Sequence, residues 1–170
     1  MAFVTGTDRV ASVGGGDLLL WDLETLSLEG AIENVENAYA GSALSPDGRM
    51  FASGEVSFDL SRTHSVRVWD VVTQQLLVEL PGHQQPVLEL AFSADGSLLA
   101  SAGGPLLLLA APAREAQIPE GPATVRVWET QTWQEAAAFQ PGNSPWEVPH
   151  GMQFSPDGQY LTYSYDGSHH

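Results

Sequence analysis

The chain has 170 residues, of which 43% are hydrophobic, and it contains no cysteine. This length corresponds to about one domain, and the hydrophobic content excludes a disordered chain. The lack of cysteine excludes disulfides, thiolate metal sites and cysteine nucleophiles. The formal net charge is −15, with six scattered arginines and no lysine. Because so few cations cannot neutralise a row of phosphates, we expect no nucleic-acid partner and no binding to anionic membranes.

No apolar run is long enough to cross a membrane, and the N-terminus lacks the basic and apolar segments of a signal peptide. The longest apolar cluster, 106–111, lies between two prolines. These features predict a cytoplasmic protein. The richness in alanine, glycine, proline and arginine without lysine indicates a GC-rich bacterial genome.

Four similar units follow one another, each predicted as short β-strands separated by glycine, proline, aspartate and serine. The strands of unit one are predicted near 1–3, 9–12, 17–21 and 28–32. Unit two covers about 39–80 and unit three about 87–139, where the alanine-rich segment 135–139 stands at the place of a fourth strand. Unit four has two predicted strands, near 151–154 and 160–164. Helical periodicity is weak throughout, so we expect an all-β protein.

A four-residue turn marks units two to four. Ser-Pro-Asp-Gly stands at 45–48 and 155–158, and Ser-Ala-Asp-Gly at 93–96. Aspartate and glycine tolerate the backbone angles of a tight hairpin, so each copy predicts a connection between two antiparallel strands. In units two and three the next strand ends in Ala-Ser, at 52–53 and 100–101.

A third strand that ends in tryptophan completes the repeat. Val-Arg-Val-Trp stands at 66–69 and 125–128, Leu-Leu-Leu-Trp at 18–21, and Pro-Gly-His at 81–83. This series resembles the WD-repeat family, whose signature pairs Gly-His with Trp-Asp. The resemblance covers nearly the whole chain and implies a partial β-propeller of about three and a half blades, each a four-stranded antiparallel sheet.

The resemblance divides a partial propeller, 1–168, into blades at about 1–36, 37–82, 83–142 and 143–168. The last blade stops where the third strand of the family should start, and this half blade is either natural or a truncation. Residues 169–170 follow Gly-Ser and belong either to the start of an affinity tag or to a natural end.

In the WD family, the tryptophan packs between blades, and a histidine, a serine and an aspartate hydrogen-bond to it and to each other. In unit three, inserted sequence displaces the aspartate. Asn143 stands where the previous unit has His83, and Asp166 holds the aspartate position of unit four with no tryptophan after it. The structural roles implied by the repeat fall on Trp21, Asp22, Asp47, Ser53, Trp69, Asp70, His83, Asp95, Ser101, Trp128 and Asp157.

No arrangement of side chains predicts catalysis. Asp47, Asp95 and Asp157 occupy the same turn of separate blades, so we expect them to lie too far apart for paired-carboxylate chemistry, which needs roughly 5–10 Å. The sequence contains no nucleophile elbow, phosphate loop, zinc spacing or EF-hand. The glycine run 14–16 precedes no helix and so does not predict a phosphate cradle. We therefore expect no enzyme, no metal and no cofactor.

The connection between the second and third strands lengthens from unit to unit. From serine to tryptophan it spans 9 positions in unit one, 16 in unit two and 27 in unit three. In the family this connection lies on one face with the connection between blades, and long loops on a rigid frame collect binding residues. The residues predicted to contact a partner there are Phe58, Arg62, His64, Arg114, Glu115, Trp146 and His150. The alternative for Phe58 and Trp146 is that they fasten their own loops.

Three functions stay open. The chain is a protein-interaction module or scaffold that binds a partner on the loop face, a self-assembling half-propeller without another ligand, or a sensor or regulatory arm of a larger enzyme or signalling protein. We expect a protein partner or a second copy of the chain, with a dimer as the simplest assembly. Open sheet edges and apolar blade faces pair with other chains.

Overall fold

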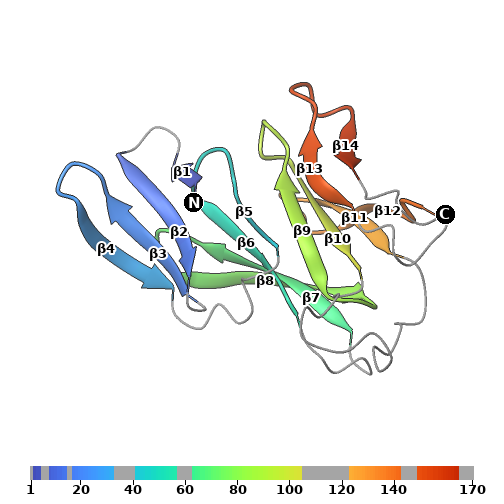
Figure 1. The fold of residues 1–170 in the computed structure, drawn as a ribbon, viewed down its shortest axis with the longest axis horizontal. Helices are drawn as coiled ribbons and strands as arrows, with labels where there is room; N and C mark the ends of the chain where they lie inside the picture. Colours follow the sequence, from blue (N-terminus) through green and yellow to red (C-terminus); the bar gives the residue numbers. More distant parts are fainter. Residues whose placement is uncertain are drawn as a thin grey trace, which may run out of the picture.

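The computed structural model describes residues 2–4, 8–14, 17–32, 41–56, 63–104, 123–142 and 149–164. The regular structure in these residues is β-strand, arranged as four antiparallel sheets that follow one another along the long axis of the molecule (Figure 1). This confirms the expected all-β fold of four-stranded antiparallel blades. Within the described residues, no helix has the length and apolar character needed to span a membrane.

Each sheet is a meander in which a strand pairs with the next one along the chain. Sheet 1 contains β1 (Ala2–Val4), β2 (Arg9–Gly14), β3 (Asp17–Asp22) and β4 (Ser27–Ile32). Sheet 2 contains β5 (Ser42–Leu44), β6 (Met50–Gly54), β7 (His64–Asp70) and β8 (Gln75–His83). Sheet 3 contains β9 (Val87–Phe92), β10 (Leu98–Gly103), β11 (Thr124–Glu129) and β12 (Glu135–Phe139). Sheet 4 contains β13 (His150–Phe154) and β14 (Leu161–Ser164).

The core consists of three apolar clusters, one between each pair of consecutive sheets. Side chains alternate along a strand, so each sheet has one face toward the preceding sheet and one toward the next. In β7, Val66 and Val68 pack against sheet 3, while Trp69 packs against sheet 1. In β3, Leu18 and Leu20 pack against sheet 2.

Two glycines allow sheets 2 and 3 to approach closely at the end where β6 and β10 finish. A Cβ atom on Gly54 would lie 2.5 Å from the carbonyl oxygen of Val87, and one on Gly103 would lie 2.7 Å from Nδ1 of His83. Neither position has room for a larger residue. The backbone N–H of Val87 donates to the carbonyl of Glu55 at 3.0 Å, which joins the two sheets at this end.

The predicted turns connect the first two strands of sheets 2, 3 and 4. In the turn of sheet 2, Ser45 Oγ donates to Asp47 Oδ1 at 2.6 Å, and the carboxylate accepts the N–H of Arg49 at 3.0 Å. Gly48 has φ 70° in this turn, Gly96 has φ 73° and Gly158 has φ 70° in the other two. The left-handed backbone at the glycine explains why Asp-Gly recurs there.

Candidate functional site

The tryptophan of the third strand is hydrogen-bonded to the serine of the second strand in three sheets. The indole N–H donates to Ser12 Oγ from Trp21 at 2.9 Å, to Ser53 Oγ from Trp69 at 3.5 Å and to Ser101 Oγ from Trp128 at 3.0 Å. In each pair the two side chains stand diagonally on neighbouring strands, because Trp128 lies opposite Leu99 and Ser101 is two residues further on. The pairing is therefore a local property of each sheet.

The pair of sheet 3 extends into a buried network with Thr124 of β11 and with His83, the last residue of β8 in sheet 2. His83 Nε2 lies 2.8 Å from Ser101 Oγ, and Nδ1 lies 3.2 Å from Thr124 Oγ1. Since the indole N–H of Trp128 can only donate, the Ser101 hydroxyl is free to donate to Nε2, and Nδ1–H then donates to Thr124. Thr124 takes the role that the family resemblance assigns to an aspartate, which inserted sequence displaces in this unit.

His83 is a neutral structural residue at pH 7. Its side chain has no exposed surface. Burial first, and then the positive charge of Arg126 and the neighbouring His64, lower the pKa of His83 to about 3. A general base must reach its substrate, and both ring nitrogens of His83 are held by hydroxyl groups in the interior.

In sheets 1 and 2 an aspartate builds the turn after the tryptophan. Asp22 Oδ1 accepts the N–H of Glu24 at 2.9 Å and of Thr25 at 2.7 Å, and these bonds, that of Thr25 first, lower the pKa of Asp22. Asp70 accepts the N–H of Val72 and of Thr73 in the same way. The acidic residue after the tryptophan therefore shapes the turn.

Sequence reasoning missed a left-handed position that ends this turn in all three sheets. Leu26 has φ 52°, Gln74 has φ 60° and Trp133 has φ 57°. The available signal was a threonine directly before each of them, at Thr25, Thr73 and Thr132. The side chain at this position reaches the preceding sheet. Gln74 Nε2 lies 2.5 Å from where a Cβ on Gly30 would stand, and Trp133 packs against the cluster between sheets 2 and 3.

Residues of the β5–β6 turn and of the β9–β10 turn line one hollow of about 440 Å³, and they include Asp47 and Asp95. Consecutive sheets bring their turns side by side, so both aspartates line the same hollow. That they lie too far apart for paired-carboxylate chemistry stays a prediction. The Ser45 hydroxyl chiefly lowers the pKa of Asp47, and the Ser93 hydroxyl chiefly lowers the pKa of Asp95 to about 2. Acid–base catalysis by two carboxyls needs pKa values pushed apart, whereas both are lowered here.

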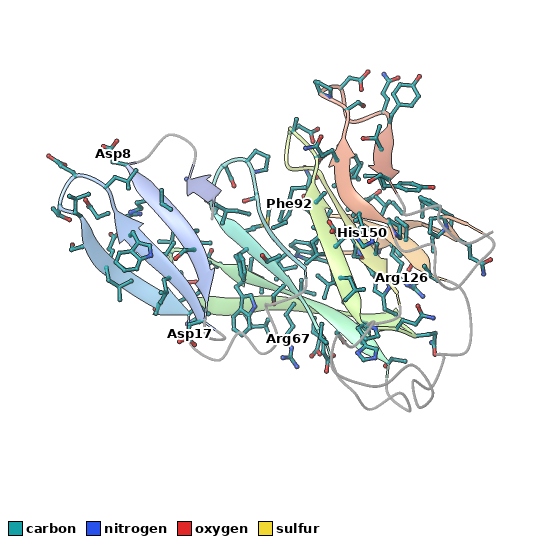
Figure 2. All side chains as sticks on the ribbon, in the orientation of Figure 1. Asp8, Asp17, Arg67, Phe92, Arg126 and His150 are labelled. Carbon is teal, nitrogen blue, oxygen red and sulfur yellow. The ribbon has the colours of Figure 1, made fainter. Side chains whose placement is uncertain are left out.

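The residues predicted to bind a partner are distributed unevenly over the described structure. His64 is the first residue of β7 and is fully buried, so a surface contact by this side chain does not fit its position. His150 begins β13 beside sheet 3, with Nδ1 3.9 Å from Glu89 Oε1 (Figure 2). Five predicted contact residues lie outside the described residues: Phe58, Arg62, Arg114, Glu115 and Trp146. The same holds for Asn143 and Asp166.

The described residues next to the long connections form a hydrogen-bonded base. The N–H of Glu55 donates to the carbonyl of Ser65 at 2.9 Å, and Glu55 Oε2 accepts the N–H of Ser65 at 3.1 Å. The N–H of Gly104 donates to the carbonyl of Pro86 at 3.0 Å. No group of three or more histidine, aspartate or glutamate side chains in the described part of the chain could hold a metal ion.

One apolar surface of the described sheets is exposed on the side of sheet 1 that faces away from sheet 2. We call it the outer face of sheet 1 and define it by Trp21, Leu23, Leu26 and Leu28, which are 37%, 41%, 80% and 50% exposed. Trp21 and Leu28 lie opposite each other on β3 and β4.

The WD40 family model (WD domain, G-beta repeat) matches residues 38–70 and 74–104, which contain strands β5 to β10. The chain contains WD repeats. The repeat signature recognised in the sequence is thereby confirmed, and the hydrogen-bonded Trp69 and Ser53 belong to a matched WD repeat.

Relatives with WD repeats match different lengths of the chain. It is 42% identical to the Periodic tryptophan protein 2 homolog of Neurospora crassa over 65 residues, which cover 38% of this chain and 7% of that protein. It is 35% identical to the U5 small nuclear ribonucleoprotein 40 kDa protein of Pongo abelii over 74 residues, covering 44% and 19%. It is 22% identical to Autophagy-related protein 18 of Schizosaccharomyces pombe over 174 residues, covering 91% and 41%.

The WD-repeat chain therefore spans less than half the length of these curated relatives. All three come from eukaryotes, so they give no support to the expected bacterial origin. WD repeats are in general non-catalytic modules that bind protein partners, which agrees with the coarse function expected from the sequence.

Proposed function

We propose that this WD-repeat chain is a non-catalytic scaffold that binds a protein partner on the face carrying the connections 57–62 and 105–122. The observation that carries the proposal is the hydrogen-bonded base under these connections. Glu55 and Ser65, which flank the connection 57–62, form two hydrogen bonds with each other. His83 is hydrogen-bonded to Thr124, two residues after the connection 105–122. Long loops anchored on a rigid frame are where binding residues collect.

The side chains that could act chemically in the described sheets are already engaged in structural contacts. His83 is bonded to Ser101, which accepts the indole N–H of Trp128. Asp47, Asp95 and Asp157 each accept bonds within their own turn. This supports a scaffold in preference to an enzyme. The same surface would serve a sensor or regulatory arm of a larger protein.

Site-specific photo-cross-linking tests the partner face. Benzoylphenylalanine replaces Phe58 in one variant and Tyr160 in a control, in cells that make the protein. Tyr160 is 67% exposed and ends the turn between β13 and β14, at the opposite end of the strands. We expect one defined protein adduct from position 58 and none from position 160. Equal adducts from both positions, or none from either, would contradict the proposal.

The non-catalytic part has a separate test. If the purified chain turned over a substrate, and Asp95→Asn or His83→Asn abolished that turnover with the fold intact, the chain would be an enzyme.

A second candidate function is self-association, which the exposed outer face of sheet 1 favours.

A further inference from the structure

Sheets 2 and 3 contain buried polar residues at the end that carries the long connections. His83, the last residue of β8, lies opposite His64, the first residue of β7, and both side chains are fully buried. Ser101 and Thr124 of sheet 3 bind the two ring nitrogens of His83. We call the end of the two sheets that contains these four residues the loop end.

The strands pair irregularly at the loop end. A register shift separates the pair of His64 and His83 from the rest of the β7–β8 ladder. A second shift separates the pair of Gly103 and Val87 from the rest of the β9–β10 ladder. Gly82, directly before His83, has φ 132°. The last pairs of both ladders are therefore set apart from the regular sheet, and such strand ends open locally at a lower free energy than the centre of a sheet.

The surroundings of His83 hold its ring neutral while the loop end is closed. Burial has the largest effect, and the positive charge of Arg126 on β11 and the neighbouring His64 on β7 add to it, so that the pKa of His83 falls to about 3. The two partners of the ring, from β10 and β11, are uncharged hydroxyl groups. A proton on His83 is therefore unfavourable in the closed state.

Two acidic residues belong to the same part of the molecule. Glu55, directly after β6, accepts the N–H of Ser65 at 3.1 Å. Glu89 of β9 lies toward sheet 4, with Oε1 3.9 Å from Nδ1 of His150. Neither carboxylate is among the groups that shift the pKa of His83, so neither offsets the effects of burial and of Arg126.

We infer that the loop end of sheets 2 and 3 opens in mild acid, because His83 takes up a proton when it leaves the interior. In the opened state the ring is hydrated and has the ordinary pKa of 6.5, so the closed state is favoured fully above pH 6.5 and less as pH falls. From pH 7 to pH 5 the opened fraction should rise about 25-fold. The loop end carries the connections 57–62 and 105–122, so the partner is bound less tightly in acid; this consequence rests on the proposed function.

Hydrogen exchange of backbone amides, followed by NMR on the full chain at pH 7 and pH 5, tests the inference. The N–H groups of Val87 and Gly104 report on the loop end, and those of Ser45 and Ser93 report on the turns at the opposite end of the same sheets. All four donate to backbone carbonyl groups, so none depends on a titrating acceptor. After correction for intrinsic exchange rates, protection at the loop end should fall about 25-fold between pH 7 and pH 5. Protection in the turns should stay the same, because a turn opens with His83 still buried.

Two variants separate the proton from the packing. Thr124→Val removes one partner of His83 and keeps the ring, so it should increase opening at pH 7 and leave the pH effect in place. His83→Asn removes the titrating group, so the pH effect at Val87 and Gly104 should disappear.

Equal pH effects at the two ends of the native chain would overturn the inference, and this comparison needs no variant. The same pH effect in the native chain and in His83→Asn would also overturn it and would assign the proton to another group, such as Glu55. The exchange experiment contains no partner. A missing adduct from position 58 at pH 7 would therefore count against the proposed function alone.

Discussion

Sheet 3 and sheet 1 contain the same tryptophan–serine hydrogen bond in two different surroundings. The bond is 3.0 Å long at Trp128 and 2.9 Å at Trp21, yet Trp128 is 5% exposed and Trp21 is 37% exposed. The tryptophan–serine hydrogen bond thus forms within a single sheet, whereas the tryptophan is buried by contact with the preceding sheet. A WD motif is therefore part of the core where it is covered and part of the surface where it is not.

Removing the three tryptophans should show the largest difference between the sheets. Trp128→Ala should lower the free energy of unfolding by about 3–5 kcal/mol, because it empties a buried site. Trp69→Ala should also destabilise the chain strongly, since Trp69 is partly buried between sheets 1 and 2. Trp21→Ala should cost less, about 1–2 kcal/mol. Urea denaturation at low protein concentration measures the three, and equal losses at Trp21 and Trp128 would contradict the account.

The buried His83 at the end of β8, which is hydrogen-bonded to Ser101 of sheet 3, predicts a pH dependence. Its folded pKa of about 3 lies below the ordinary value of 6.5, so the unfolded chain binds a proton where the folded chain does not. The contribution of neutral, buried His83 to the free energy of unfolding is complete above pH 6.5 and is lost as pH falls toward 3. Between pH 7 and pH 5 we expect a loss of about 2 kcal/mol.

His83→Asn is the control for this loss. Denaturant midpoints at pH 7 and pH 5 should move further apart in the native chain than in the variant. This interval lies above the range in which the aspartates take up protons. The same pH effect in both chains would show that His83 is not the group responsible.

Thr124→Val sharpens the comparison by removing one partner from the network while keeping the shape of the side chain. Nδ1 of His83 then lacks its partner in the interior, and an unsatisfied buried donor costs about 1–3 kcal/mol. Thermal or urea unfolding measures the change. Thr25→Val is a suitable comparison in sheet 1, because Thr25 is exposed, and it should have a much smaller effect.

The smallest expected difference concerns the left-handed residues. Leu26→Gly should raise stability by about 0.5–1 kcal/mol, since glycine adopts a positive φ without strain and the replaced side chain is 80% exposed. Trp133→Gly relieves the same strain but loses packing against sheet 2, so it should lower stability. Melting temperatures that shift in the same direction would show that burial does not separate the two positions.

The sequence predicted the strands well because its signals are local. The tryptophan that ends the third strand and the Ser-Pro-Asp-Gly turn each depend on a few neighbouring residues. The alanine-rich segment 135–139 also forms a strand, β12, because its pairing with Val125 and Val127 of β11 outweighs the helical propensity of alanine.

Contacts between sheets were not predictable in the same way. Thr124 follows a long insertion, so its position beside His83 depends on how the chain returns to the sheet. His64 was placed in a loop, whereas its pairing with His83 across β7 and β8 buries it. That Asp47 and Asp95 line one hollow depends on how sheets 2 and 3 pack together, which no local pattern predicts.

Hydrogen exchange of the indole N–H groups, followed by NMR, tests most directly whether the preceding sheet covers the WD motif. At low concentration the account predicts slow exchange for Trp128 and fast exchange for Trp21, with Trp69 between them. Equal protection of Trp21 and Trp128 at low concentration would contradict it.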